Sequence, residues 1–168
     1  MATRVELFPY DQSWEQAFSE LADDMHKLIG ASIRAIDHVG STAVPGMPAK
    51  PIIDVDITLA SLADIPAASA VLTASGYEPR GNRYDDDVCA FMKHDRKPKQ
   101  RIYLCPPENE THRRRLIFRD YLRAHKDVAA AYAALKQQLA AKFPNDGDRY
   151  TAEKRDFIET VVARARYA

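Results

Sequence analysis

The sequence predicts an α/β fold whose last third is helical. Up to residue 105, short apolar runs with the content of strands alternate with segments of helical periodicity. After the Pro106-Pro107 pair, the apolar spacing is helical throughout. This order favours a small sheet with helices on one side, followed by a helical C-terminal third. A length of 168 residues favours one domain, residues 1–168, with a substantial core.

The first elements follow from one apolar stripe and one glycine. Residues 5–8 are a short apolar piece, which we expect to be a strand or an extended arm. Asp11 then suits a helix N-cap, and apolar residues follow at helical spacing: Trp14, Phe18, Leu21, Met25 and Leu28. Gly30 ends this helix, and residues 33–39 form the next strand. We expect Trp14 to anchor the core, because aromatic side chains mostly serve packing, although stacking on a ligand is the alternative.

Turn residues and caps delimit the remaining elements. Residues 52–59 have the content of a strand, and a helix from Ser61 or Asp64 to 73 is closed by Gly76. Three further strands, 77–79, 88–93 and 101–105, are joined by polar turns. Three C-terminal helices follow: one capped by Asn109 or Thr111 and running through 122, one from 127 to 143, and a last that begins at Thr151.

The segment from residue 38 to residue 57 carries the strongest functional signal. It reads HVGSTAVPGMPAKPIIDVDI, a Gly-Ser turn, a proline-stiffened connection and then a strand. Gly40 permits backbone angles closed to other residues and lets a ligand approach the chain closely. The amides of Gly40, Ser41 and Thr42, together with the two hydroxyl groups, suit an anion-binding concavity.

Two aspartates are set into the strand that follows this turn. Side chains alternate faces along a strand, so Ile52, Asp54 and Asp56 share one face. Two carboxylates about 7 Å apart repel each other unless a cation lies between them, and Mg²⁺ is usually held by one or two carboxylates with substrate phosphates. A surface pair of aspartates is the alternative, but Asp is depleted in strands. The motif therefore predicts a phosphoryl- or nucleotidyl-transfer site with Asp54 and Asp56 as ligands of Mg²⁺ or Mn²⁺.

Several other charged segments have two interpretations each. Lys50 suits a phosphate contact or a solvated loop equally well. The acidic run 85–87 is a solvated loop, or one member is a third metal ligand. The basic loop 93–101 is placed to steer an anionic substrate. A helical stripe of His112, Arg115 and Arg119 is a solvated face or faces phosphate.

Composition excludes several classes of protein. Hydrophobic residues make up 46% and charged residues 29%, which is typical of a globular chain. The formal net charge is zero, so a strongly basic nucleic-acid surface is not indicated. No run of about 20 apolar residues suggests a membrane span, and no signal peptide is evident. Cys89 and Cys105 fall in apolar contexts typical of buried thiols, which favours the cytoplasm.

The strand, Gly-Ser turn and Asp-x-Asp strand resemble the core of the nucleotidyltransferase superfamily, the DNA polymerase β-like fold. More narrowly, the chain is similar to the GrpB family over nearly its full length. The segments that carry this resemblance are residues 38–56, FRDYL at 118–122, YAALK at 132–136, and Tyr150-Thr151 with Lys154 and Phe157-Ile158.

The resemblance implies a mixed β-sheet with flanking helices and transfer of a nucleoside monophosphate from a nucleoside triphosphate to an acceptor that family membership does not identify. It implies that Asp54 and Asp56 bind Mg²⁺ and that the Gly40–Thr42 turn holds phosphates. Three basic positions of the family pattern would complete the anion site: Arg119, Lys136 and Lys154. Similar domains fused to dephospho-CoA kinase imply an accessory role near coenzyme or nucleotide metabolism.

One departure from the superfamily pattern keeps two alternatives open. Active members usually carry a third carboxylate on a neighbouring strand, but residues 102–104 are Ile, Tyr and Leu. A non-catalytic module that binds a nucleotide or another phosphorylated small molecule is therefore the alternative to an enzyme. A structural partner domain with a vestigial pocket is a third, which the intact Gly-Ser turn and Asp-x-Asp strand disfavour.

Overall fold

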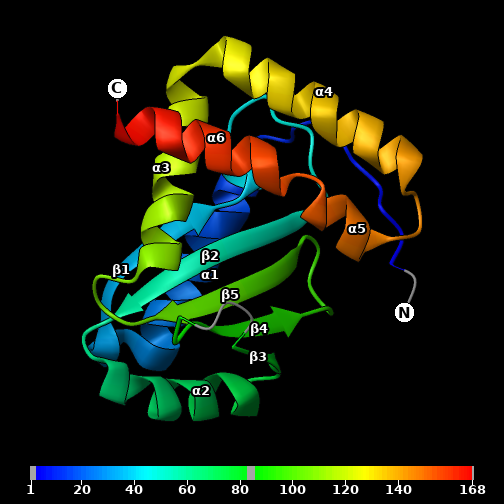
Figure 1. Cartoon of the computed structure of the whole chain (residues 1–168). Coiled ribbons are helices and arrows are strands. Elements are labelled where there is room, and N and C mark those ends of the chain that lie inside the picture. The colour runs from blue at the N-terminus through cyan, green and yellow to red at the C-terminus, as the bar shows by residue number, and fades with distance from the viewer. Residues whose placement is uncertain (1–2, 83–85, 168) are drawn as a thin grey trace.

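A five-stranded mixed sheet organises the chain in the computed structural model, which describes residues 3–82 and 86–167 (Figure 1). The strand order is β1-β2-β5-β4-β3. The central pair β2 and β5 is parallel, and the other neighbours are antiparallel. The strands are β1 (Ile33–Val39), β2 (Ile52–Leu59), β3 (Glu78–Asn82), β4 (Cys89–Lys93) and β5 (Lys99–Cys105).

Strand β2 has the alternation that its sequence predicts. Ile53, Val55 and Ile57 are at most 1% exposed and belong to the main hydrophobic core. Asp54 and Asp56 therefore lie on the opposite face. The register places Asp56 between Asp37 of β1 and Tyr103 of β5, and it places Asp54 beside Arg101 of β5.

Helices α1 (Ser13–Ile29) and α2 (Ile65–Ala74) cover the core face of the sheet. Helix α1 begins two residues after Asp11, whose carboxylate accepts a hydrogen bond from the Ser13 amide. Trp14 is buried in the main core and packs edge-on against Tyr10, as expected of a core anchor.

Helix α3 (Glu110–Ala124), the first of the C-terminal helices, lies on the other face. The polar face of β2 explains this position, because Asp56 there contacts the basic stripe of α3. Asn109 caps the helix through a bond from the His112 amide, as predicted. Asp86 adds a second cap, since its Oδ2 accepts hydrogen bonds from the Thr111 amide and hydroxyl at 3.0 and 2.8 Å.

The C-terminal helices are α4 (Lys126–Lys142), α5 (Gly147–Ala152) and α6 (Arg155–Arg166), of which α4 and α6 lie at the top of Figure 1. A single last helix from Thr151 is therefore wrong. Asp146 caps α5, and the chain breaks at Glu153 and Lys154 before α6 begins. A second core joins α3, α4 and α6 to the loop after the Gly-Ser turn, and its buried residues are Val44, Met47, Leu122 and Tyr132. This core fixes a helical wall above the polar face of the sheet.

Smaller differences concern the edges of elements. Residues 5–8 form the extended arm, joined to the body by a Phe8–Ala49 bridge and a hydrogen bond from the Val5 amide to Pro144. Strand β5 begins two residues before its predicted start at Arg101. Strand β3 continues for three residues beyond its predicted end at residue 79. Cys89 and Cys105 are free thiols, half-buried and buried. Within the described residues, every helix is too short or too polar to cross a bilayer.

Candidate functional site

The Gly-Ser turn packs directly against β2. Gly40 has φ +75° and ψ −173°, a conformation nearly confined to glycine. A Cβ at this position would lie 2.8 Å from Oδ2 of Asp54. The turn therefore requires glycine for its backbone angles and for its close approach to the carboxylate. Residues Ser41–Ala43 continue as one 3₁₀ turn.

The Thr42 hydroxyl is committed to the turn itself. It lies 2.9 Å from Nε2 of His38 and donates to the carbonyl of Ile52. Burial lowers the pKa of His38 to about 4, so its imidazole is neutral at pH 7. His38 also stacks on Phe18 with ring centroids 4.7 Å apart. These contacts brace the turn, so the predicted phosphate donor Thr42 serves the protein in this conformation.

Asp56 is already paired with two cations of α3. It is fully buried, and its oxygens lie 2.9 Å from Nδ1 of His112 and 2.6 Å from a guanidinium nitrogen of Arg115. The same guanidinium lies over the Tyr103 ring, at 3.9 Å from its centroid. Tyr103 thus lies beside Asp56 on β5, and its aromatic ring packs against the guanidinium of Arg115.

Asp37 is a third carboxylate that the sequence interpretation missed. It pairs with Asp56 across β1 and β2, and Nε2 of His112 lies 3.4 Å from its Oδ2. His112 therefore bridges the two carboxylates, and these contacts, Asp37 first, raise its pKa to about 9. Only the register of the antiparallel β1–β2 pair, which brings residues 37 and 56 together, reveals this role.

Asp54 has a different environment from Asp56. Among the described residues, no donor makes a hydrogen bond to its buried Oδ1, and the nearest ion-pair partner is Arg101 at 3.4 Å. Burial raises the pKa of Asp54, while the nearby Arg101 opposes that shift. The carboxylate is thus held near positive charge without a hydrogen bond to one of its oxygens.

A divalent metal does not fit these residues as they stand. His112 and Arg115 each place positive charge against one oxygen of Asp56, and this charge opposes a divalent cation at the same carboxylate. In the described part of the chain, Asp56, Cys105 and His112 also offer ligand atoms within 4.8 Å of one another. Burial raises the pKa of the Cys105 thiol, and the deprotonated form that binds metal is disfavoured.

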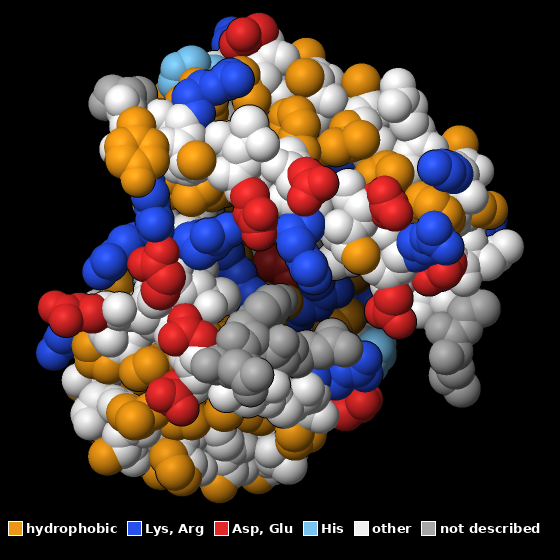
Figure 2. Space-filling view, in the orientation of Figure 1, with side chains coloured by type: hydrophobic (Ala, Val, Ile, Leu, Met, Phe, Trp, Pro, Cys, Tyr) orange, Lys and Arg blue, Asp and Glu red, His pale blue; other side chains and the backbone are white. Residues whose placement is uncertain are grey.

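Three lysines from separate segments lie close enough to repel one another, and one of them contacts the Gly-Ser turn. Lys136 of α4 is 2% exposed, and its ammonium donates to Oγ of Ser41 at 2.7 Å and to the carbonyl of Pro48. Lys50 and Lys154 lie over the ring of Tyr150, at 4.9 and 4.2 Å. Figure 2 shows Lys and Arg side chains gathered around a hollow between the sheet and the C-terminal helices.

The lysines repel one another. Burial, and then repulsion from Lys154 and Lys50, lowers the pKa of Lys136 to about 7. Burial and Lys50 lower the pKa of Lys154 to about 8, and burial also lowers that of Lys50. Lys50 is half-buried and makes no ion pair with a carboxylate among the described residues.

The remaining predicted residues lie elsewhere in the site or outside it. Arg119 donates to the carbonyl of His38 at 3.0 Å and pairs with Asp120, so it supports the end of β1. Asp86 is used in capping α3 and does not turn back towards Asp54. Asp85 lies outside the described residues. In the basic loop, Lys93 donates to the carbonyl of Ser75.

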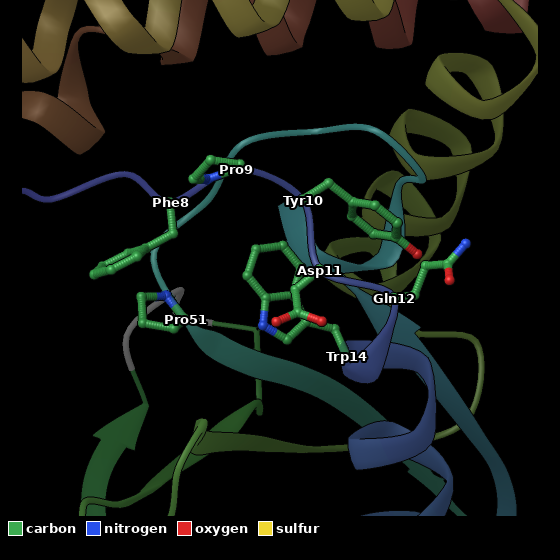
Figure 3. Close-up of a pocket in the computed structure, with 7 residues that line it drawn as sticks. All are labelled: Phe8, Pro9, Tyr10, Asp11, Gln12, Trp14 and Pro51. Carbon is green, nitrogen blue, oxygen red and sulfur yellow. The ribbon is translucent and has the colours of Figure 1, made fainter.

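A separate hollow of about 570 Å³ lies where the N-terminal arm passes the start of β2 (Figure 3). Its lining is aromatic and proline-rich, and the carboxylate of Asp11 within it is bonded to the Ser13 amide. The hollow brings no cluster of charged groups together, so the lysine cluster is the better candidate site. The residues that line the hollow are Phe8, Pro9, Tyr10, Asp11, Gln12, Trp14 and Pro51.

Comparison with known proteins gives a match over almost the whole chain. The family model described as GrpB protein matches residues 4–164. YqkA of Bacillus subtilis, a UPF0157 protein, is 36% identical over 97% of this chain, which spans 48% of YqkA. The glutamate-rich protein GrpB of Alkalihalophilus pseudofirmus is 31% identical over 93% of this chain and 92% of its own. A dephospho-CoA kinase of Mycolicibacterium paratuberculosis is 31% identical over 96% of this chain, which covers 46% of the kinase.

Solved structures agree with this match. The crystal structure of the conserved protein GrpB from Enterococcus faecalis has a TM-score of 0.87 and 28% identity, over 95% of this chain and 96% of that one. The Cid1 poly(U) polymerase with MgGTP bound has a TM-score of 0.53 at 12% identity, over 80% of this chain and 44% of that one. The likeness to Cid1 concerns the fold alone.

Proposed function

The chain belongs to the GrpB family, and on that premise we propose that it binds a nucleoside triphosphate or another phosphorylated small molecule. The ligand's phosphates would lie between the polar face of β2 and the helical wall. The observation that carries this proposal is the cluster of Lys50, Lys136 and Lys154, in which Lys136 contacts the Gly-Ser turn and the other two share the Tyr150 ring. Buried cations need anionic partners, and phosphate supplies several acceptor oxygens at once.

The fold supports the same proposal. Cid1, which shares the fold, has been solved in complex with the UTP analogue UMPNPP and with MgGTP bound. For this chain a nucleotide is therefore the leading phosphorylated ligand. We propose that the Gly40 turn and Ser41 line the phosphate end of the site, because Ser41 already contacts Lys136.

Equilibrium binding tests this function. Each of the four common nucleoside triphosphates would be titrated calorimetrically into the full chain, in a buffer that contains Mg²⁺. We expect saturable binding of at least one triphosphate, weakened in Lys154→Met and unchanged in Lys126→Met. Lys126 is an exposed matched control at the start of α4, ten residues before Lys136. Absence of heat with every triphosphate would contradict the proposal.

A second candidate is Mg²⁺- or Mn²⁺-dependent transfer of a nucleoside monophosphate to an acceptor. It is favoured by Asp54 and Asp56 on one face of β2 and by the buried Asp54 Oδ1, which lacks a hydrogen bond among the described residues. Such an enzyme requires His112 and Arg115 to leave Asp56. Triphosphates labelled at the α-phosphate, incubated with cell extract as the acceptor pool, test it. Label moved by the wild type but not by the double variant Asp54→Asn, Asp56→Asn would support transfer.

A further inference from the structure

The positive charge of the site comes from three places in the chain that fold together. Lys50 precedes β2, Lys136 comes from the middle of α4, and Lys154 stands at the break between α5 and α6. Lys50 and Lys154 share the Tyr150 ring, and Lys136 reaches the Gly-Ser turn. No regular helical or strand spacing produces this arrangement, so it depends on the tertiary fold.

These lysines have no carboxylate partner within ion-pair distance in the part of the chain that the structure describes. The acidic groups whose charge they feel are Asp54 and, for Lys50, the exposed Asp148. Lys136 alone is explained as a brace, because Ser41 and the Pro48 carbonyl accept its protons. The aromatic contacts of Lys50 and Lys154 leave their charge uncompensated. An anion with several charges would compensate it.

The acidic groups, in contrast, are already compensated by protein cations. His112 and Arg115 contact the two oxygens of Asp56, and Arg101 lies 3.4 Å from Asp54. In a two-carboxylate metal site, the metal neutralises carboxylates and phosphates together. Here side chains of α3 and β5 neutralise the carboxylates. Lys50 and Lys154 remain to contact phosphates, and Lys136, held by Ser41 and the Pro48 carbonyl, adds its positive charge behind them.

We propose that Lys50, Lys136 and Lys154 take the place of a divalent cation, and that the site binds a polyphosphate without one. The ligand class is the tail of a nucleoside triphosphate, or an inorganic polyphosphate with the same charge. Three ammonium groups from three segments suit a chain of phosphates better than one phosphate group. This inference rests on the proposed phosphate site and adds that binding needs no metal.

The wild-type chain tests the inference directly. ATP and inorganic tripolyphosphate would each be titrated calorimetrically in a buffer with EDTA and in the same buffer with Mg²⁺. We expect binding in EDTA, with an affinity equal to that in Mg²⁺ within about threefold or tighter, because Mg²⁺ screens the phosphate charge. Binding that appears only with Mg²⁺ overturns the metal-free site but keeps the phosphate site. Absence of binding in both buffers overturns both proposals. Binding of tripolyphosphate as tight as that of ATP identifies the phosphates as the recognised group.

Variants separate the lysines from the carboxylates. In EDTA, Lys50→Met and Lys154→Met should each weaken tripolyphosphate binding by at least about tenfold, while the exposed Lys126→Met should not. Asp54→Asn should bind as tightly as the wild type or more tightly, because it removes negative charge near the lysines. Loss of binding in Asp54→Asn would overturn the inference, since it would show that the site needs the Asp54 carboxylate as well as the lysines. Thermal unfolding of each variant shows that the fold is retained.

Discussion

The backbone of Gly40 lies against the carboxylate of Asp54. The distance from an added Cβ to Oδ2 would be 2.8 Å, and the three nearest atoms to it all belong to Asp54. The Gly-Ser turn and the Asp-x-Asp strand are therefore one packed unit. A substitution in either segment should therefore disturb the packing of the other, because adding a methyl group to a close-packed interior is destabilising.

Gly40→Ala should be much more destabilising than Gly46→Ala. Both glycines have positive φ, +75° and +82°, so both variants meet backbone strain. A Cβ at Gly46 would meet nothing within 4 Å, whereas at Gly40 it meets Asp54. We expect Gly40→Ala to cost at least about 2 kcal/mol more in the free energy of unfolding, measured by urea denaturation. Equal costs in the two variants would contradict the close packing.

The two aspartates of β2 should respond in opposite ways to the same substitution. Asp56→Asn removes the carboxylate that faces Arg115 and leaves His112 with Asp37 alone, and breaking such a buried pair costs about 3–5 kcal/mol. Asp54→Asn removes a carboxylate whose burial raises its pKa, so we expect stability to change by less than about 1 kcal/mol or to rise. Urea denaturation at pH 7 measures both. Greater destabilisation by Asp54→Asn than by Asp56→Asn would contradict this assignment.

His112 should make the stability of the chain depend on pH. Its contacts with Asp37 and then Asp56 raise its pKa from 6.5 to about 9. The folded state therefore holds a proton that the unfolded state releases between these values, so the stabilisation is complete below pH 6.5 and is lost as the pH rises through about 9.

The comparison that isolates this contribution is between the wild type and His112→Gln. The difference in their free energies of unfolding should be large at about pH 6 and much smaller at about pH 10. Denaturation curves at the two pH values provide the measurement. A difference that does not change with pH would show that His112 stabilises only by packing and neutral hydrogen bonds.

The sequence predicted the parts of the fold that depend on local pattern. Alternation in β2 predicted the faces of Asp54 and Asp56, and Asn109 was a correct cap candidate because capping is local. It did not predict the break at Lys154, since the residues around it suit a continuous helix. Asp146 caps α5 and the chain breaks at Glu153 and Lys154.

The sequence predicted the motif of the candidate site, but it did not predict which residues contact Asp56. The stripe of His112 and Arg115 was identified, but either a solvated face or phosphate was expected opposite it. Its actual partner, Asp56, lies more than 50 residues away and is set by how α3 crosses the sheet. Asp37 was missed because its role depends on the β1–β2 register. Long-range pairing is a tertiary property, and periodicity within one segment does not contain it.

Binding of a polyphosphate should draw protons from solution. Burial, and then the charge of neighbouring lysines, lowers the pKa of Lys136 to about 7 and that of Lys154 to about 8. Near pH 8 these lysines are therefore partly neutral in the free chain. Phosphate charge favours their protonated form and raises both pKa values. Affinity should consequently fall as the pH rises from about 7 to about 9, since each lysine then needs a proton before it attracts the ligand.

Calorimetry of tripolyphosphate binding at about pH 8, in two buffers with different ionisation enthalpies, measures this proton uptake. The observed enthalpies should differ between the buffers in the wild type. The difference should shrink in Lys154→Arg, because a guanidinium is charged throughout this pH range and takes up no proton. Equal enthalpies in the two buffers for the wild type would show that the lysines are already protonated before the ligand arrives. In that case their mutual repulsion is relieved by a group other than the ligand.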